Sequence, residues 1–176
     1  MNIWHDISPD RISEDEFCAV VEIPKGSKNK YELDHETGLL RLDRVLFTAT
    51  HYPANYGFIP RTLAEDDDPL DVMILCSESI GPMTLVESKP IGVLKMIDQG
   101  AVDEKIIAVC AHDPFYNKYK DIADLPTHVF EEIRHFYAVY KTLENKDTLV
   151  KEILGLSEAK AIIAKAIAAY LKEYSL

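Results

Sequence analysis

Residues 65–75 read Glu65-Asp66-Asp67-Asp68-Pro69-Leu70-Asp71-Val72-Met73-Ile74-Leu75, and five of the first seven side chains are carboxylates. Every residue after Pro69 except Asp71 is apolar, which is typical of a strand that is buried on both faces. Because proline keeps the residue before it extended, the preceding aspartates are expected on the loop that enters this strand. An ionised carboxylate inside an apolar run is costly unless it is paired or coordinates a metal. The stretch therefore predicts a site for a hard divalent cation such as Mg²⁺ or Mn²⁺.

The same acidic run also fits a solvated turn that caps a strand, as most acidic runs do. For Asp66 and Asp68 alone, the solvated turn and the metal site are equally supported. Asp71 lies inside the apolar segment and favours the metal site. An EF-hand loop is excluded because its sixth and twelfth positions require glycine and glutamate. Counted from Asp66, these positions hold Asp71 and Ser77.

The composition is that of a chain that can bury a core, with 176 residues of which 47% are hydrophobic. Acidic residues outnumber basic ones by 30 to 19, and the net charge of −11 argues against a duplex nucleic acid or an anionic membrane as partner. A small anion bridged by metal ions stays compatible with this charge. Three cysteines without CxxC spacing, Cys18, Cys76 and Cys110, predict buried free thiols in a reducing compartment.

No targeting or membrane segment is recognisable in the chain. Residues 1–16 lack the apolar core of a signal peptide, and no stretch approaches the roughly 20 apolar residues of a membrane span. Internal repeats, low-complexity linkers and domain boundaries are also absent from the sequence. We therefore expect a soluble cytoplasmic protein with one domain over residues 1–176.

The front of the chain is expected to be rich in strands, at residues 17–23, 30–34 and 39–47, with a hairpin turn at residues 35–38. Glu22 lies in the first strand among apolar neighbours, where it either faces water at a sheet edge or belongs to a polar site. Alternation places Arg44 on the same face as Leu40 and Leu42. An arginine in that position either snorkels to water or points into a polar site.

A second hairpin is expected from strands at residues 92–97 and 105–111. Its connection carries Asp98 and Asp103 close to the tip, and Lys105 follows at once. Paired acids at a hairpin end can be solvated. They can also combine with the neighbouring lysine into metal ligands beside an anion contact.

The last third of the chain is predicted to be helical. A helix introduced by Pro126 and Thr127 carries an apolar stripe at Val129, Ile133, Phe136, Tyr140 and Leu143. Tyr140 and Lys141 fall in its final turns. A second helix, opened by Gly155, has the spacing of a helix laid on a sheet, with a stripe at Ile163, Ile167, Tyr170, Leu171 and Tyr174.

Residues 48–60 add a cluster of aromatic side chains, among them Tyr52 and Tyr56, which fit core packing with hydroxyls that reach water. Carboxylates that hold divalent cations, together with cationic and phenolic side chains that bind phosphate oxygens, are the parts of a phosphoryl-transfer site. The cationic and phenolic candidates are Lys30, Arg44, Lys105, Lys141, Tyr52, Tyr56 and Tyr140. Spacing alone does not show that these segments converge, so phosphate chemistry is here the best of several interpretations.

Specific motifs narrow this choice. Residues 66–72 match an aspartate-rich D-x-D-P-x-D signature. The segments that follow the same pattern in order are Glu22-Ile23-Pro24, Lys30-Tyr31-Glu32, Asp43-Arg44, Tyr52-Pro53-Ala54-Asn55-Tyr56-Gly57, Pro90-Ile91-Gly92, Asp98 with Asp103 and Lys105, and Tyr140-Lys141. From about residue 17 to residue 146 the chain thus resembles the family I soluble inorganic pyrophosphatases of bacterial type, and the combined motifs are highly specific.

The resemblance implies a mainly β fold with α-helices, namely an OB-like closed β-barrel flanked by C-terminal helices, with the site at its mouth. It implies a Mg²⁺-dependent diphosphatase that hydrolyses pyrophosphate to two orthophosphates by a metal-activated water at a multi-Mg site. Mn²⁺ or another divalent cation could substitute. A homohexamer is also implied, with neither nucleic acid nor membrane as partner.

Residue roles follow from the same resemblance. The expected metal ligands are Asp66, Asp71, Asp98 and Asp103, with Asp71 bridging two ions. Asp68 is expected to be the general base. The catalytic residues that bind phosphate oxygens are expected to be Lys30, Arg44, Tyr56, Lys105, Tyr140 and Lys141, so for Arg44 a polar site replaces snorkelling. Around them are expected Tyr52 and the two glutamates Glu22 and Glu32, which would hold metal-bound waters or neighbouring lysines.

The chain departs from the family pattern at four places. Gln99 stands where the family usually has glutamate, which puts one contact to a metal-bound water in doubt. Lys89 replaces the commoner arginine, and residues 145–147 replace the usual Gly-Lys-Trp. Val139 stands where some bacterial relatives carry histidine near subunit contacts. We expect these departures to alter metal affinity or assembly stability, and not to abolish activity.

Two other hypotheses stay open. In the first, the acidic loop and hairpin form a divalent-cation binding module without catalysis, which leaves the basic candidates without a role. In the second, an OB-fold binds nucleic acid and its aromatic side chains stack on bases. The net charge of −11 argues against this second hypothesis.

Overall fold

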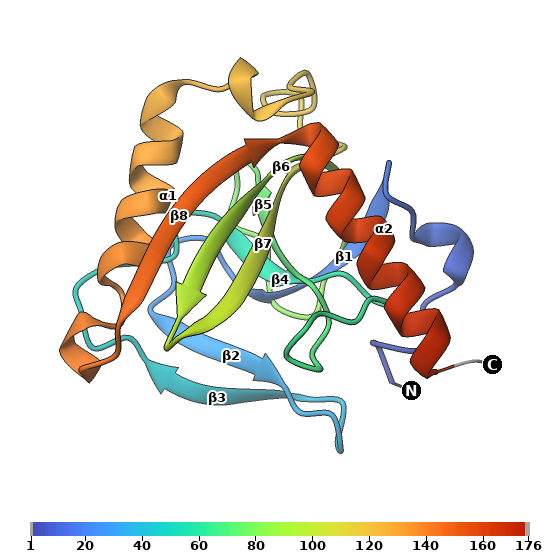
Figure 1. Ribbon diagram of the computed structural model, residues 1–176, viewed down its shortest axis with the longest axis horizontal. Coiled ribbons are helices and arrows are strands. Elements are labelled where there is room, and N and C mark those ends of the chain that lie inside the picture. Colours follow the sequence, from blue (N-terminus) through green and yellow to red (C-terminus); the bar gives the residue numbers. More distant parts are fainter. Residues whose placement is uncertain (1, 175–176) are drawn as a thin grey trace.

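The computed structural model describes residues 2–174, which contain eight strands, two α-helices and three short 3-10 helices (Figure 1). The strands are β1 (Phe17–Ile23), β2 (Asn29–Leu33), β3 (Leu40–Val45), β4 (Asn55–Phe58), β5 (Asp71–Leu75), β6 (Leu85–Asp98), β7 (Ala101–Cys110) and β8 (Thr148–Gly155). The helices are η1 (Pro9–Arg11), η2 (Ile122–Asp124), α1 (Thr127–Val139), η3 (Thr142–Glu144) and α2 (Leu156–Glu173). The mainly β character with helices, as predicted, is confirmed.

Six of the strands form one sheet in the order β1-β4-β5-β7-β6-β8, and β1 additionally pairs with β6. Because β1 is hydrogen-bonded to β4 on one edge and to β6 on the other, five strands close into a ring. β8 extends the sheet beyond β6. β2 and β3 form a separate hairpin that crosses below the ring in Figure 1.

The strand predicted from the opening stretch is present as β5 and is buried on both faces. Met73 and Leu75 pack into a hydrophobic cluster that includes side chains of α1, whereas Val72 and Ile74 pack into one that includes side chains of α2. β5 runs parallel to β7, with Asp71 opposite Lys105. Each helix therefore covers one face of this sheet, and the first residue of β5 shares the α1 face with Lys105.

Two β-bulges redirect acidic and basic side chains. In β1 the register with β4 shifts between Val21 and Ile23, which leaves Glu22 as the extra residue. In β3 the register shifts so that Lys30 opposes Arg44 while Tyr31 opposes Leu42. Since successive residues face opposite sides, Arg44 and Leu42 do not share a face, and the predicted placement of Arg44 beside the leucines is wrong.

The second hairpin is longer than predicted. β6 and β7 pair up to Asp98 opposite Ala101, so only Gln99 and Gly100 form the turn. Both turn residues have positive φ, 49° and 88°, which matches the twist of two-residue hairpin turns. Asp98 and Asp103 therefore lie on strands that extend to the tip, and not on a loop.

The helical third contains a strand that was not predicted. β8 (Thr148–Gly155) precedes α2 and pairs with β6. Exposed and half-buried residues do not alternate strictly along this strand, so its sequence lacks the two-residue period that indicates a strand. A second unpredicted strand, β4, falls in the aromatic segment, where Gly57 allows β1 to approach closely.

The helices occupy the predicted positions with some corrections. α1 ends at Val139, so Tyr140 and Lys141 lie just beyond its end and not in its final turns. Leu143 and Leu171 belong to the predicted apolar stripes, but 63% and 54% of their surfaces are exposed. Leu143 lies in η3, outside the helix whose periodicity included it.

Two further findings concern the length of the helices and the state of the cysteines. None of the helices in residues 2–174 is long and apolar enough to cross a membrane. All three cysteines are free thiols, but Cys110 is only half-buried, in contrast to Cys18 and Cys76.

Candidate active site

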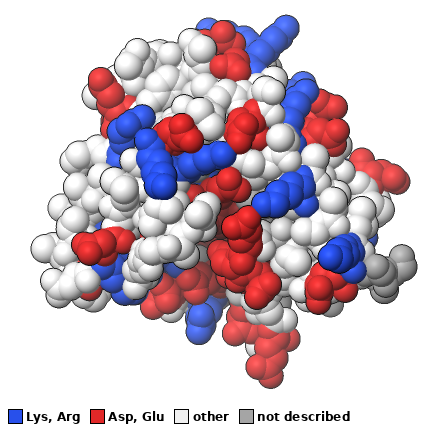
Figure 2. Space-filling view, in the orientation of Figure 1, with Lys and Arg blue, Asp and Glu red and all other residues white. Residues whose placement is uncertain are grey.

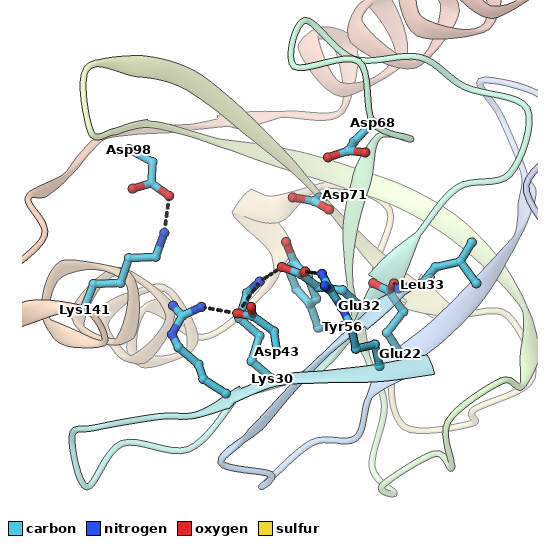
Figure 3. Close-up of polar contacts among 12 residues, drawn as sticks. Glu22, Lys30, Glu32, Leu33, Asp43, Tyr56, Asp68, Asp71, Asp98 and Lys141 are labelled. Atoms are coloured by element: carbon cyan, nitrogen blue, oxygen red, sulfur yellow. Dashed lines mark hydrogen bonds and ion pairs between the residues drawn. The ribbon is translucent and has the colours of Figure 1, made fainter. Parts of the chain in front are cut away.

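A cavity of about 370 Å³ brings together the predicted site residues. All of them line it except Arg44, and they come from β1, β2, β4, the loop before β5, β5 itself, the β6–β7 hairpin and the end of α1. Figure 3 shows Asp68, Asp71 and Asp98 on one side of this space and Lys30 with Glu32 on the other. Segments far apart in the sequence therefore converge, which spacing alone could not show.

The cavity also contains residues that sequence reasoning missed. Tyr31, His35, Arg41 and Tyr137 line it, as do several apolar side chains. Tyr137 precedes Tyr140 by three residues on the same side of α1, so the helical period offered a signal for it. The prediction placed Tyr140 in the apolar stripe and passed over its neighbour.

Lys105 is the buried centre of the cavity, with 3% of its surface exposed. Its Nζ donates hydrogen bonds to Asp71 Oδ2 at 2.8 Å, to the Tyr56 hydroxyl at 2.9 Å and to Asp103 at 3.0 Å. Desolvation by itself would lower the pKa of Lys105, but Asp71, Tyr56 and Asp103 outweigh it and raise this pKa well above its usual value. Lys105 is therefore a permanent cation that two carboxylates neutralise.

The same surroundings destabilise the charged form of Asp103, whereas they stabilise the charged form of Lys105. Desolvation raises the pKa of Asp103, the Lys105 charge lowers it, and repulsion from Asp71 raises it again, with a net increase. Two carboxylates that share one ammonium thus still repel each other. An additional positive charge in this place would relieve that repulsion.

Asp98 forms the second cation–carboxylate pair. Lys141, 7% exposed, donates from its Nζ to Asp98 Oδ2 (Figure 3). The other carboxylate oxygen, Oδ1, is buried and has no hydrogen-bond partner among the described residues. A buried carboxylate oxygen without a partner is costly, so this atom is suited to receive a cation or a donor that the chain does not supply.

The β2–β3 hairpin supplies a third group of charges. Lys30 is paired with Glu32 and lies 3.5 Å from Asp43 Oδ2, while Arg44 donates to the same Asp43 oxygen (Figure 3). The second partner of Arg44 is Glu144, whose Oε1 lies 2.7 Å from Nε. Although desolvation opposes it, the bonds to Asp43 and Glu144 raise the pKa of Arg44. The bulge in β3 directs the Arg44 side chain toward Asp43 and Glu144. This direction accounts for the absence of Arg44 from the cavity wall.

The acidic loop itself is largely open to water. Figure 2 shows acidic side chains gathered at the centre of one face, over the loop that precedes β5, where Glu65, Asp66 and Asp67 are exposed. The Asp68 side chain is 64% exposed and lies 3.5 Å from His35 Nε2. Partial desolvation and then the charge of Asp66 raise the pKa of Asp68. Such a carboxylate is a better proton acceptor than an ordinary surface aspartate.

Glu22 is buried and does not face water. Its Oε1 accepts a hydrogen bond from the Leu33 amide at 2.8 Å, which fastens β1 to the β2–β3 hairpin. Desolvation, and secondarily repulsion from Asp71, raise the pKa of Glu22 to about 8. The polar-site interpretation of Glu22 therefore fits its position better than the sheet-edge interpretation.

The phenols form a layer beneath these charges. Tyr52, Tyr56 and Tyr140 are 3%, 8% and 4% exposed, and burial raises the pKa of each hydroxyl above its usual value. They therefore stay protonated and can donate hydrogen bonds to an anion. Tyr52 and Tyr140 have aromatic contacts with Phe136, which fixes their rings against α1.

The donor set fits hard divalent cations by its chemistry, since it consists of carboxylate oxygens. As the side chains of residues 2–174 stand, however, no three histidine, cysteine or acidic side chains are close enough together to hold a metal ion. Lys105 instead occupies the space between Asp71 and Asp103, as a cation of the chain itself. That position and the unpartnered Asp98 oxygen both indicate places that favour positive charge.

Comparison with known proteins gives a consistent result. A model of the family described as inorganic pyrophosphatase matches residues 19–171. Soluble inorganic pyrophosphatase 2 of Chlamydomonas reinhardtii is 47% identical over 171 residues, which cover 97% of this chain and 89% of that protein. A soluble inorganic pyrophosphatase of Oryza sativa is 51% identical over 156 residues, covering 89% of this chain and 73% of that protein.

Solved structures agree with the sequence relatives. The inorganic pyrophosphatase from Thermus thermophilus superposes with a TM-score of 0.89 at 38% identity, covering 97% of this chain and 99% of that one. For the inorganic pyrophosphatase from Helicobacter pylori the TM-score is 0.87 at 44% identity, with 90% of this chain and 95% of that one covered.

Proposed function

The chain belongs to the inorganic pyrophosphatase family, and from this premise we propose that it hydrolyses inorganic pyrophosphate to two orthophosphates. The observation that carries the proposal is the cavity in which four acidic candidates, Asp66, Asp71, Asp98 and Asp103, face three buried or half-buried lysines. A cavity of about 370 Å³ is large enough for a small polyanion with its counterions.

The cationic residues would bind and orient the substrate. Lys30, Lys105 and Lys141 can contact phosphate oxygens from the cavity wall, and Arg44 can reach them once Asp43 or Glu144 releases it. The hydroxyls of Tyr56 and Tyr140 would add neutral donors. Charges that are fixed in a buried site stabilise a developing charge on the leaving phosphate at little reorganisation cost.

Asp68 would act as the general base. It combines a raised pKa with an exposed side chain at the cavity entrance, so it can accept a proton from an attacking water and return it to solvent. Asp66 accepts a hydrogen bond from the Asp68 amide at 3.3 Å, which helps to hold the loop in this conformation.

The residues that would hold Mg²⁺, or Mn²⁺ in its place, are Asp66, Asp71, Asp98 and Asp103. When bound, such cations supply positive charge to the phosphate oxygens and lower the pKa of a coordinated water. Glu22, Glu32 and Tyr52 would support this layer from outside. Glu22 would do so through its contact with the Leu33 amide and Glu32 through its ion pair with Lys30.

We further propose that the ring of five strands is an OB-like closed barrel, that the chain forms one domain, and that it acts as a cytoplasmic homohexamer. The ring closure by β1 and β6 supports the first of these. Size-exclusion chromatography with light scattering would test the hexamer, and a monomer at micromolar concentration would contradict it.

The decisive experiment measures orthophosphate release from pyrophosphate, first with Mg²⁺ and then with the metal chelated. Rapid release that chelation abolishes is the expected result. No release from folded protein in either condition would overturn the hydrolase. If calorimetry then showed Mg²⁺ binding, the chain would be a cation-binding module.

A further inference from the structure

Tyr137 has a hydroxyl that the fold does not use. The residue lies on α1, lines the cavity and is 1% exposed. Its hydroxyl oxygen is buried and has no hydrogen-bond partner within residues 2–174. Leaving a buried hydroxyl unpaired costs free energy, and phenylalanine would avoid that cost without changing the ring.

Packing accounts for the ring but not for the hydroxyl. The ring meets Phe136 and Tyr140 edge-on, with centroids 5.0 and 5.4 Å away. Another tyrosine of the fold with the same burial has a partner for its hydroxyl. Tyr170, also 1% exposed, places its hydroxyl 2.7 Å from His5 Nδ1. The Tyr137 hydroxyl, in contrast, keeps its full capacity to form hydrogen bonds in the cavity.

Lys105 is a charged group close to the Tyr137 ring. Its Nζ lies 5.2 Å from the Tyr56 centroid and 5.5 Å from the Tyr137 centroid. The three N–H donors of the ammonium are taken by Asp71, Asp103 and Tyr56, so none is left for Tyr137.

A divalent cation that binds Asp71 and Asp103 competes with Lys105 for their carboxylate oxygens and weakens these two ion pairs. The ammonium would then remain buried with weakened acceptors, which is costly for a charged donor. The hydroxyl of Tyr137, whose ring centroid lies 5.5 Å from the same Nζ, is an acceptor that no described residue uses.

We propose that Tyr137 is a positioning residue whose hydroxyl accepts a hydrogen bond from Lys105 when a divalent cation takes over Asp71 and Asp103. Lys105 would then be held between two phenols, directed at the cavity and free to contact phosphate. The inference rests on the metal site of the proposed function and adds a residue to it. It accounts for a buried hydroxyl that no described residue pairs.

Tyr137→Phe tests the proposal by cation binding in the absence of substrate, with Tyr170→Phe as the matched control. Mn²⁺ affinity is measured by electron paramagnetic resonance of the free ion, and Mg²⁺ affinity by calorimetry. We expect Tyr137→Phe to bind these cations at least about tenfold more weakly, the scale of a hydrogen bond to a charged group. In chelator its melting temperature should equal or exceed that of the wild type, because an unpaired hydroxyl is gone.

The control should behave in the opposite way. Tyr170→Phe loses a paired hydroxyl outside the cavity, so its melting temperature should fall while its cation affinity stays unchanged. Wild-type cation affinity in Tyr137→Phe would overturn the proposal. An equal loss of affinity in both variants would also overturn it, since a general effect on stability would then be the cause.

A double-mutant cycle shows whether Tyr137 acts through Lys105. In a Lys105→Met background the Tyr137→Phe change should no longer alter cation affinity. A persistent loss of about tenfold would contradict the proposal that Tyr137 acts through Lys105. If Lys105→Met does not fold, the comparison with Tyr170→Phe decides alone. Orthophosphate release is measured separately. If the wild-type protein binds cations but releases no orthophosphate, the proposed function is wrong. The cation-affinity test of Tyr137 remains valid in that case.

Discussion

Lys105 illustrates how individual residues divide roles in this site. It is enclosed by the fold, yet Asp71 and Asp103 maintain its charge, and in turn it offsets part of the repulsion between these two carboxylates. The same pattern recurs at Lys141 with Asp98 and at Lys30 with Glu32. Cations and substrate that bind as proposed would therefore exchange partners with the chain's own ion pairs, and binding one is expected to facilitate binding the other.

At Asp68 the raised pKa leads to a prediction about turnover. Asp68→Asn removes the proposed proton acceptor and should lower turnover by at least about 100-fold, the scale of general-base assistance. Steady-state orthophosphate release with saturating Mg²⁺ measures this. The control is Asp67→Asn, because Asp67 is exposed and its φ of 68° is one that asparagine tolerates. Near-normal turnover in Asp68→Asn would remove the residue from the base role.

Glu22 predicts a dependence of stability on pH. Its folded pKa of about 8 exceeds the ordinary glutamate value of 4.5, so the folded state holds a proton that the unfolded state releases. The free energy of unfolding should therefore fall as pH rises from about 5 to 8 and level off above. Glu22→Gln removes this dependence, so between pH 5 and pH 9 it should gain about 3–5 kcal/mol relative to wild type. Urea unfolding in chelator measures it, and parallel pH profiles would contradict the assignment.

At the scale of the elements, irregularities in the strands determine where charges point. The bulges at Glu22 in β1 and at Asp43 in β3 each interrupt the alternation of faces. The first turns an acid into the interior and the second turns Arg44 away from the leucines. A regular hairpin would have placed these side chains on the wrong side of the cavity.

The pairing of β1 with β4 depends on Gly57. A Cβ atom on this residue would lie 1.8 Å from the Val20 carbonyl oxygen, which belongs to the backbone and cannot move aside cheaply. Gly57→Ala should therefore destabilise the protein by about 3 kcal/mol or more, or prevent folding. The matched control, Gly81→Ala, has no described atom within 4 Å of the new Cβ and should change stability by less than about 0.5 kcal/mol. Chemical denaturation compares the two, and equal stability would show that β1 moves away freely.

At the scale of the whole molecule, the net charge of −11 is concentrated in part around one cavity. Repulsion among these acids lowers the stability of the folded state, and a bound divalent cation relieves it. The metal-free protein is therefore expected to be less stable than its cation-bound form. We expect that a monovalent salt does not restore this difference in stability.

Thermal unfolding tests this expectation. Mg²⁺ at 100 times its dissociation constant should add about 2.7 kcal/mol, or about 5–10 °C in melting temperature for a chain of this size. NaCl at the same ionic strength should give a much smaller shift, because screening does not replace coordination. Asp71→Asn should lose most of the Mg²⁺ effect. A shift that persists in that variant would place the stabilising ion elsewhere.

The amino-acid sequence by itself determined the family of the protein and predicted most of the residues that line the candidate site. The apolar runs predicted β1 and β5, turn residues predicted both hairpins, and the D-x-D-P-x-D stretch led to the inorganic pyrophosphatase family. These features are local, because side-chain alternation, proline and clustered carboxylates act within a few residues. They require no knowledge of the partner strand.

Other features depend on which strands and side chains meet across long sequence separations. The parallel register that sets Asp71 beside Lys105, the bulges that redirect Glu22 and Arg44, and the addition of β8 to β6 are products of pairing between distant segments. The unpartnered hydroxyl of Tyr137 is visible only once its surroundings are known. Burial and hydrogen-bond satisfaction are properties of the packed chain, so they become definite only when the tertiary structure is formed.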